Sequence, residues 1–141
     1  MIRGVDGRPP ARTRTAAQQA GDAAETLVAD QLIDDGWTVL ARNVHVGRHE
    51  LDLVAVDPGP PTELVFLEVR WRVRRDFGLA EETVDHRKRR RLRVAAFTLL
   101  ERGVLPDGAA LPDFAVRFDL VAVEPPLGDA PPRVRHHRAA F

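Results

Sequence analysis

The sequence predicts a single α/β domain in which helices flank a central mixed β-sheet. The chain has 141 residues, of which 44% are hydrophobic, and this is enough for one domain with one core. Two amphipathic helical patterns occur among runs of apolar and β-branched residues that are typical of strands. The second helical pattern lies between two strand patterns, which is the order expected of a crossover that joins parallel strands.

The N-terminal residues and the overall composition suggest a cytoplasmic protein. Residues 1–14 are rich in Gly, Pro and Arg without periodicity, so we expect a flexible basic arm before a folded domain over 15–141. The first residues lack the apolar segment of a signal peptide, and the chain has no cysteine for disulfide bonds. No apolar run is long enough for a membrane span, so we expect no membrane partner.

The first half of the domain is predicted to be one helix followed by three strands. Apolar residues recur at three- and four-residue steps over 15–35, and Gly36 follows as a stop signal. Strands are expected over 37–46, 51–56 and 64–71. The sequence DPGPP separates the last two, and because proline cannot donate a ladder hydrogen bond, it predicts a turn between antiparallel neighbours.

The second half is predicted to contain a helix over 80–102 and two further strands. Gly103 ends the helical pattern, and strands are expected over 114–123 and 133–137. Arg117 and Asp119 are expected to form an internal ion pair at the start of the first of these strands. The predicted buried side of the helix consists of Val84, Leu92, Ala95, Ala96, Leu99 and Leu100.

Acidic residues interrupt the apolar pattern of the predicted hairpin over 51–71. If its turn is centred on Pro60, residues whose numbers sum to about 120 face each other, which sets Asp52 opposite Glu68 and Glu50 opposite Arg70. The even-numbered residues then share one face, while odd-numbered residues, Leu51 among them, share the other. The polar residues therefore gather at one end of one face of a strand pair that is otherwise apolar on both sides.

Two carboxylates at directly opposed positions need a neutralising partner. At ~5 Å two negative charges repel by roughly 3 kcal/mol at an effective dielectric constant of ~20. One carboxyl could stay protonated, Arg70 could neutralise the pair, or a divalent cation could lie between them. Mg²⁺ is commonly held by one or two carboxylates together with substrate phosphate. A salt-bridged or solvated acidic pair without metal remains an alternative interpretation.

Seven stretches follow one another in the order and with the short spacers of a known protein family. They are GDAAETLVADQL (21–32), GWTVLARN (36–43), HELDLVAVD (49–57), LVFLEVRWR (64–72), DFGLAEETVDHRKRRRL (76–92), RFDLVAV (117–123) and HHRAAF (136–141). The chain resembles the YraN-like family of small uncharacterised bacterial proteins, which are assigned to the restriction-endonuclease-like fold. The motif of an acidic residue followed by Glu-x-basic is similar to that of the PD-(D/E)xK nucleases. The resemblance implies a restriction-endonuclease-like domain over 15–141.

The resemblance also implies a set of metal ligands and a reaction. Asp52 and Glu68 match the two carboxylates of the motif, the carbonyl of Val69 is a further ligand, and Glu25 matches a helical glutamate that contributes in some relatives. These residues would hold Mg²⁺ or Mn²⁺, which polarises a phosphodiester and activates water. The implied function is that of a metal-dependent endonuclease acting on nucleic acid, with DNA favoured over RNA.

The sequence departs from the family pattern at position 70, where arginine replaces the expected lysine. Arg70 keeps its charge at any working pH, so it can face a phosphate but cannot accept a proton from water. Lys88, the only lysine of the chain, matches a basic family position and is a candidate for supporting catalysis. Further basic residues that could bind nucleic-acid phosphates are Arg72, Arg74, Arg75, Arg87, Arg89 and Arg90.

Two other functions remain open at this point. The net charge is zero, which argues against a protein that coats nucleic acid through bulk charge, but the basic residues gather locally. A catalytically inactive nucleic-acid-binding module of the same fold would retain these basic residues. A protein-interaction role would make the acidic pair vestigial, with neither metal nor nucleic acid bound.

Overall fold

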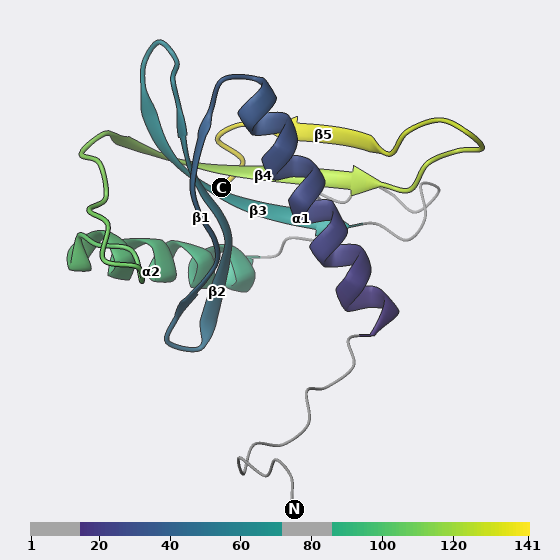
Figure 1. Cartoon of the computed structure of the whole chain (residues 1–141). Helices are drawn as coiled ribbons and strands as arrows, with labels where there is room; N and C mark the ends of the chain where they lie inside the picture. The colour runs from purple at the N-terminus through teal and green to yellow at the C-terminus, as the bar shows by residue number, and fades with distance from the viewer. Residues whose placement is uncertain (1–14, 72–85) are drawn as a thin grey trace, which may run out of the picture.

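The computed structural model describes residues 15–71 and 86–141 (Figure 1). The predicted arm over 1–14, Val84 and the predicted helix start over 80–85 lie outside the described residues, as do Arg72, Arg74 and Arg75. The elements are α1 (Ala16–Asp34), β1 (Thr38–Val46), β2 (His49–Asp57), β3 (Glu63–Trp71), α2 (His86–Arg102), β4 (Ala115–Glu124) and β5 (Arg133–His137).

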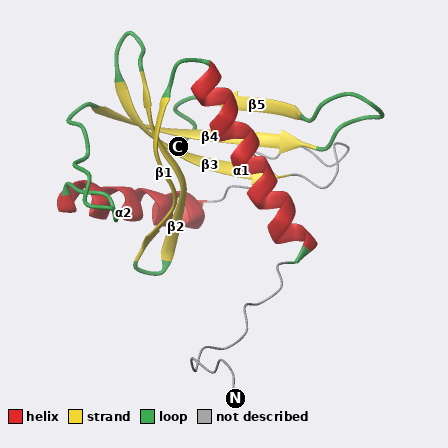
Figure 2. Cartoon of the chain, in the orientation of Figure 1, coloured by secondary structure: helices red, strands yellow, loops and turns green. Residues whose placement is uncertain are grey.

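The five strands form one mixed sheet in the order β1-β2-β3-β4-β5 (Figure 2). β3 and β4, the strands before and after α2, are parallel, and the other neighbouring strands are antiparallel. The prediction of an α/β domain with a mixed sheet is therefore confirmed. Within the described residues, neither helix is long and apolar enough to cross a membrane.

Helix α1 begins and ends where its sequence signals predict. The side chain of Thr15 accepts a hydrogen bond from the Gln18 N–H, and the Gln18 side chain accepts one from the Thr15 N–H, which completes a capping box. At the other end, Gly36 adopts φ of +92°, a left-handed conformation that favours glycine and turns the chain into β1.

The sheet is covered on both faces, one by each helix. On the first face, α1 packs Val28 and Leu32 against Leu53 and Val65. On the second face, α2 packs against a cluster that includes Val54 and Phe66, and its buried residues are the predicted Leu92, Ala95, Ala96 and Leu99. This two-sided burial explains why both faces of the hairpin are apolar in sequence.

The hairpin register confirms the prediction over most of its length and corrects it at one end. Leu53 pairs with Leu67 and Val56 with Leu64, as a turn centred on Pro60 requires. The described ladder between β2 and β3 stops at Leu53, and Glu50 lies opposite His45 of β1. The predicted pairing of Glu50 with Arg70 is therefore wrong, and the predicted pairing of Asp52 with Glu68 is made by side chains and is not part of the ladder.

The structure also corrects the predicted face of Leu51. This residue belongs to the cluster under α2, on the face of Val54, and not to the face of Leu53. The turn end of the β1–β2 hairpin curves away from β3 toward α2 (Figure 1). Packing of the hairpin against α2 therefore overrides simple alternation in this part of β2.

The predicted ion pair at the start of β4 is part of a larger network. Arg117 donates to both carboxylate oxygens of Asp119 at 2.8 Å, and also to Asp57 at 3.0 Å and Glu63 at 2.8 Å. Asp119 is fully buried and also receives hydrogen bonds from the Ala139 N–H and contacts His136 Nε2. Burial alone would raise the pKa of Asp119, but the hydrogen bonds from Arg117 and these partners outweigh it and lower the pKa to about 2.

Candidate metal centre

Asp52 lies at the point where β2 separates from β3. The β2–β3 ladder ends at the preceding pair, Leu53 and Leu67, and the next N–H of β3 that points toward β2 belongs to Val69. This N–H donates a 2.8 Å hydrogen bond to Asp52 Oδ2. The acceptor is therefore a side-chain oxygen of β2 and not a backbone carbonyl. This hydrogen bond, made where β2 and β3 separate, holds the Asp52 carboxyl group in place.

Glu68 meets Asp52 from β3, as the sequence predicts. Its side chain is buried, with only 6% exposed, and its carboxyl group is in hydrogen-bond contact with that of Asp52. Two cations approach the same oxygen: Lys88 Nζ lies 2.7 Å from Glu68 Oε1, and Arg70 Nε lies 3.7 Å from it. The structure therefore brings together both predicted carboxylates and both basic residues.

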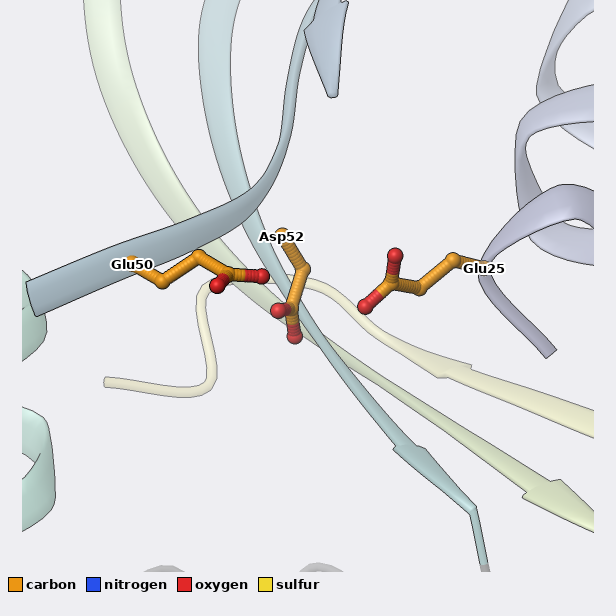
Figure 3. A group of neighbouring side chains, drawn as sticks. All are labelled: Glu25, Glu50 and Asp52. Atoms are coloured by element: carbon orange, nitrogen blue, oxygen red, sulfur yellow. The ribbon is translucent and has the colours of Figure 1, made fainter. Parts of the chain in front are cut away.

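Two further glutamates face Asp52 from opposite sides. Figure 3 shows Glu25 on α1 and Glu50 on β2 pointing toward Asp52. Ligand oxygens of the three side chains all lie within 4.8 Å of one another. With its amide nitrogen turned toward them, Asn43 donates to Glu25 at 2.7 Å and to Glu50 at 2.9 Å. The predicted helical glutamate is thus at the site, and Glu50 joins it.

The sequence analysis did not assign Glu50 or Asn43 to the site. Glu50 is on the even-numbered face with Asp52, so the two-residue period of β2 was a usable signal. Asn43 is harder to find, because it acts through a left-handed backbone conformation with φ of +51°. Asparagine is among the few residues that adopt this conformation readily, but the sequence alone does not say what its side chain reaches.

The crowding of carboxyl groups perturbs their protonation. Burial raises the pKa of Asp52 to about 9, helped by the charge of Glu68 and by the hydrogen bond between them, while the Val69 N–H lowers it only in part. Burial and the charges of Glu50 and Asp22 also raise the pKa of Glu25. Without a bound metal ion, Asp52 therefore holds a proton at neutral pH.

Two surface pockets meet at Glu50. One, of about 320 Å³, lies on the α1 side and is lined by Asp22, Glu25, Arg42, Asn43, His45 and Glu50. The other, of about 260 Å³, lies on the α2 side and includes Arg48, His49, Lys88 and Arg91 beside Glu50. Solvent therefore reaches the acidic cluster from an acidic side and from a basic side.

The predicted nucleic-acid-binding residues of α2 do not line these two pockets. Arg87 is exposed on the helix. Arg89 and Arg90 line a separate pocket together with His86, Arg93 and Phe141. The basic residues that line the two pockets at Glu50 include Arg91, which belongs to the predicted basic run of α2, and Arg48, which the sequence analysis did not single out.

The match with known proteins covers every residue of the candidate centre. Residues 24–123 match the sequence model of the Uncharacterised protein family UPF0102. The chain belongs to this family. This confirms the resemblance to YraN-like proteins seen in the sequence. The match extends from one residue before Glu25 to the end of the part of β4 that pairs with β3.

Relatives described as UPF0102 proteins are similar over most of their length. One from Anaeromyxobacter dehalogenans is 43% identical over 126 residues, which cover 88% of this chain and 84% of the relative. One from Moorella thermoacetica is 42% identical over 112 residues, covering 79% and 82%. One from Solibacter usitatus is 39% identical over 132 residues, covering 92% and 91%. These family members carry no description of an activity.

Proposed function

We propose that this UPF0102 protein is a metal-dependent endonuclease with the restriction-endonuclease-like fold, which hydrolyses phosphodiester bonds of nucleic acid. The observation that carries the proposal is the contact between Asp52 and the buried Glu68, with Lys88 Nζ 2.7 Å from Glu68. An acidic pair of a buried Glu68 and a half-buried Asp52, which holds a proton when no metal ion is bound, is poorly arranged for stability alone. Its arrangement is well suited to a site that exchanges this proton for a metal ion.

The donor set fits a small hard cation. Asp52, Glu68, Glu25 and Glu50 offer only carboxylate oxygens, which suit Mg²⁺ and Mn²⁺. Asp52 and Glu68 would hold the ion, with the Val69 carbonyl and Glu25 as further ligands. When bound, the ion would polarise the scissile phosphate and activate water. Asn43 would hold Glu25 and Glu50 in place through the amide hydrogen bonds described above.

The two cations near Glu68 have different tasks in this proposal. Arg70 stays protonated, and its buried Nε finds no hydrogen-bond acceptor among residues 15–71 and 86–141, so it can donate to a substrate phosphate. Lys88 carries a primary amine in place of a guanidinium, and its Nζ lies 2.7 Å from Glu68 Oε1. Lys88 would therefore supply from α2 the amine that the motif usually provides at position 70.

We expect Glu68→Gln to abolish cleavage. The amide keeps the size of the side chain but removes the negative charge that would hold the cation. The measurement is cleavage of single-stranded and branched DNA in Mg²⁺ or Mn²⁺, with EDTA as the metal-free reference. Glu101→Gln, an exposed residue of α2, is the matched control and should cut like the wild type. No cleavage by the wild type in either metal, on any of these substrates, would contradict the proposal.

Lys88 and Arg70 should respond differently to substitution. We expect Lys88→Met to lower the cleavage rate by about 10²–10⁴-fold, the usual contribution of a proton-transfer group. Arg70→Lys should change it by less than about tenfold, because an amine is already present at Lys88. Comparison of single-turnover rates checks both. If Arg70→Lys raises the rate strongly while Lys88→Met has no effect, the assignment to Lys88 is wrong.

A second candidate function is a nucleic-acid-binding module without catalysis. The observation that favours it is Arg70 at the position where the motif has lysine. This candidate predicts salt-dependent binding of nucleic acid with no cleavage in any divalent metal. It also predicts that Lys88→Met weakens binding no more than loss of any other phosphate contact would.

A further inference from the structure

One side of α2 combines basic residues with an exposed aromatic ring. His86, Arg90, Arg93 and Phe97 follow one another at three- and four-residue steps, and Arg89 comes three residues after His86 and four before Arg93. At about 3.6 residues per turn these five residues therefore form a single stripe along the helix. The stripe is distinct from the buried side, which carries Leu92, Ala95 and Leu99. We refer to these five residues as the α2 stripe.

The aromatic part of the α2 stripe belongs to a small cluster of rings. Phe97 is 52% exposed, although its ring makes an edge contact with Phe118, with 6.0 Å between centroids. Phe118 also packs against Phe141 at 5.5 Å, and the guanidinium of Arg93 lies 5.8 Å from the centre of the Phe118 ring. Phe97 is thus held at its edge while more than half of its surface faces solvent.

The basic part of the α2 stripe lines a pocket in which no lining residue of the described chain is acidic. This pocket has a volume of about 330 Å³ and is lined by His86, Arg89, Arg90, Arg93 and Phe141. Arg89 Nε is buried, and no residue in the described part of the chain accepts a hydrogen bond from it. Three guanidinium groups gathered in one pocket repel each other unless an anion joins them. The pocket therefore has the charge and the unused donor of an anion site.

We propose that the α2 stripe binds an unpaired strand of nucleic acid. The arginines would contact successive phosphates, and a base would stack on the exposed face of Phe97. Stacking on a side chain requires a base that is free of its partner, so the stripe favours single strands over duplex. The inference rests on the proposed function in taking nucleic acid as the substrate. It adds that the strand is unpaired where it crosses α2.

The stripe can deliver a strand to the candidate metal centre because the two share α2. Lys88, which contacts Glu68, directly precedes Arg89 in the helix. A phosphate held by Arg89 is therefore bound next to Lys88, the residue of α2 whose side chain contacts Glu68. Single-stranded regions beside a duplex or a junction are the substrate class that this arrangement fits.

The test is binding measured in EDTA, where no metal-dependent cleavage can occur. A fluorescein-labelled twelve-nucleotide oligo-dT and a twelve-base-pair duplex are titrated with wild-type protein, and binding is followed by fluorescence anisotropy. We expect tighter binding of the single strand. Phe97→Leu should weaken it by about 5–50-fold without changing the salt dependence, since stacking and not charge is lost. Phe114→Leu, at a comparably exposed phenylalanine outside the α2 stripe, should bind like the wild type.

A second variant tests the charges of the α2 stripe. Arg89→Gln combined with Arg90→Gln should reduce the slope of log K against log salt by about 1.4, or about 0.7 for each phosphate contact on a single strand. Equal binding of duplex and single strand, or wild-type affinity in Phe97→Leu, would overturn the inference. Because no metal is present, this outcome is independent of whether the protein cleaves DNA, so failure of the stripe and failure of the nuclease proposal are distinguishable.

Discussion

Replacement of Arg117 by leucine should destabilise the protein by about 3–5 kcal/mol, because it leaves buried carboxylates without their cation. Arg117 is the only described side chain that hydrogen-bonds to Asp57, Glu63 and Asp119 together. Asp119 is fully buried, and without Arg117 it retains only the Ala139 N–H and His136. Urea unfolding at pH 7 measures the loss.

The dependence of this loss on pH provides a second check on the Arg117 network. The pKa of Asp119 is lowered to about 2 in the folded protein, against roughly 3.9 in an unfolded chain. Its contribution to stability is therefore fully present above about pH 4 and is lost as the pH falls through 2. In Arg117→Leu the pKa of Asp119 should rise, so the variant should lose less stability than the wild type between pH 4 and 2.

The control for Arg117 is an exposed arginine of the same sheet. Arg133 on β5 is 57% exposed at its side chain and lies 4.0 Å from Glu124. Arg133→Leu should therefore change the free energy of unfolding by less than about 1 kcal/mol. If Arg117→Leu were as mild as this control, the network would not be the stabilising element that its geometry implies.

Replacement of Asp52 by asparagine should abolish cation binding while making the metal-free protein more stable. Asparagine has the same shape and can still accept the hydrogen bond from the Val69 N–H, but it carries no charge. We expect cleavage to fall by at least about 100-fold, since a bound ion stabilises the transition state by several kcal/mol. The free energy of unfolding without metal at pH 8 should rise by about 1–3 kcal/mol.

The sign of this stability change follows from the raised pKa of Asp52. The folded protein keeps the Asp52 proton up to about pH 9, whereas an unfolded chain releases it near roughly pH 3.9. The folded state therefore binds more protons within this window, and wild-type stability declines as the pH rises through it. Asp52→Asn should lack this decline. Unfolding curves in EDTA at pH 5 and pH 8 measure the difference.

A cation must displace the same proton, so metal binding should respond to pH in the opposite direction. Stabilisation of the wild type by Mn²⁺ should grow from pH 6 to pH 8.5 as the proton becomes easier to remove. Asp30→Asn, an exposed position of α1, is the matched control and should keep both the metal response and the wild-type pH dependence. An Asp52→Asn protein that still gains stability from Mn²⁺ would show that the ion binds elsewhere.

Local rules were sufficient for the fold and for the acidic pair at its centre. The DPGPP turn and the two-residue period fix the register from Leu53 with Leu67 to Asp57 with Glu63. One step past this ladder, the side chains of Asp52 and Glu68 meet. Helix periodicity and capping signals place α1 and with it Glu25. The helix signals depend on residues close to one another in sequence, and the hairpin register depends only on the position assumed for the DPGPP turn.

The remaining features depend on contacts that are distant in sequence. The part of β2 before Asp52 departs from β3, and Leu51 packs in the cluster under α2. Strict alternation therefore predicts the wrong face for Leu51, and the assumed register predicts a wrong partner for Glu50. Lys88 reaches Glu68 only because the chain crosses over between parallel strands and returns α2 to this end of the sheet. The reach of Arg117 to Asp57 likewise joins residues sixty positions apart. Sequence patterns can mark such residues as candidates, but they do not predict which distant residues these side chains contact.

Calorimetric titration of Mn²⁺ into the metal-free protein at pH 8 tests the central claim most directly. A saturable heat is expected for the wild type and for Asp30→Asn, and none for Asp52→Asn or Glu68→Gln. Absence of a saturable heat in the wild type would contradict the proposal that Asp52 and Glu68 form a cation site.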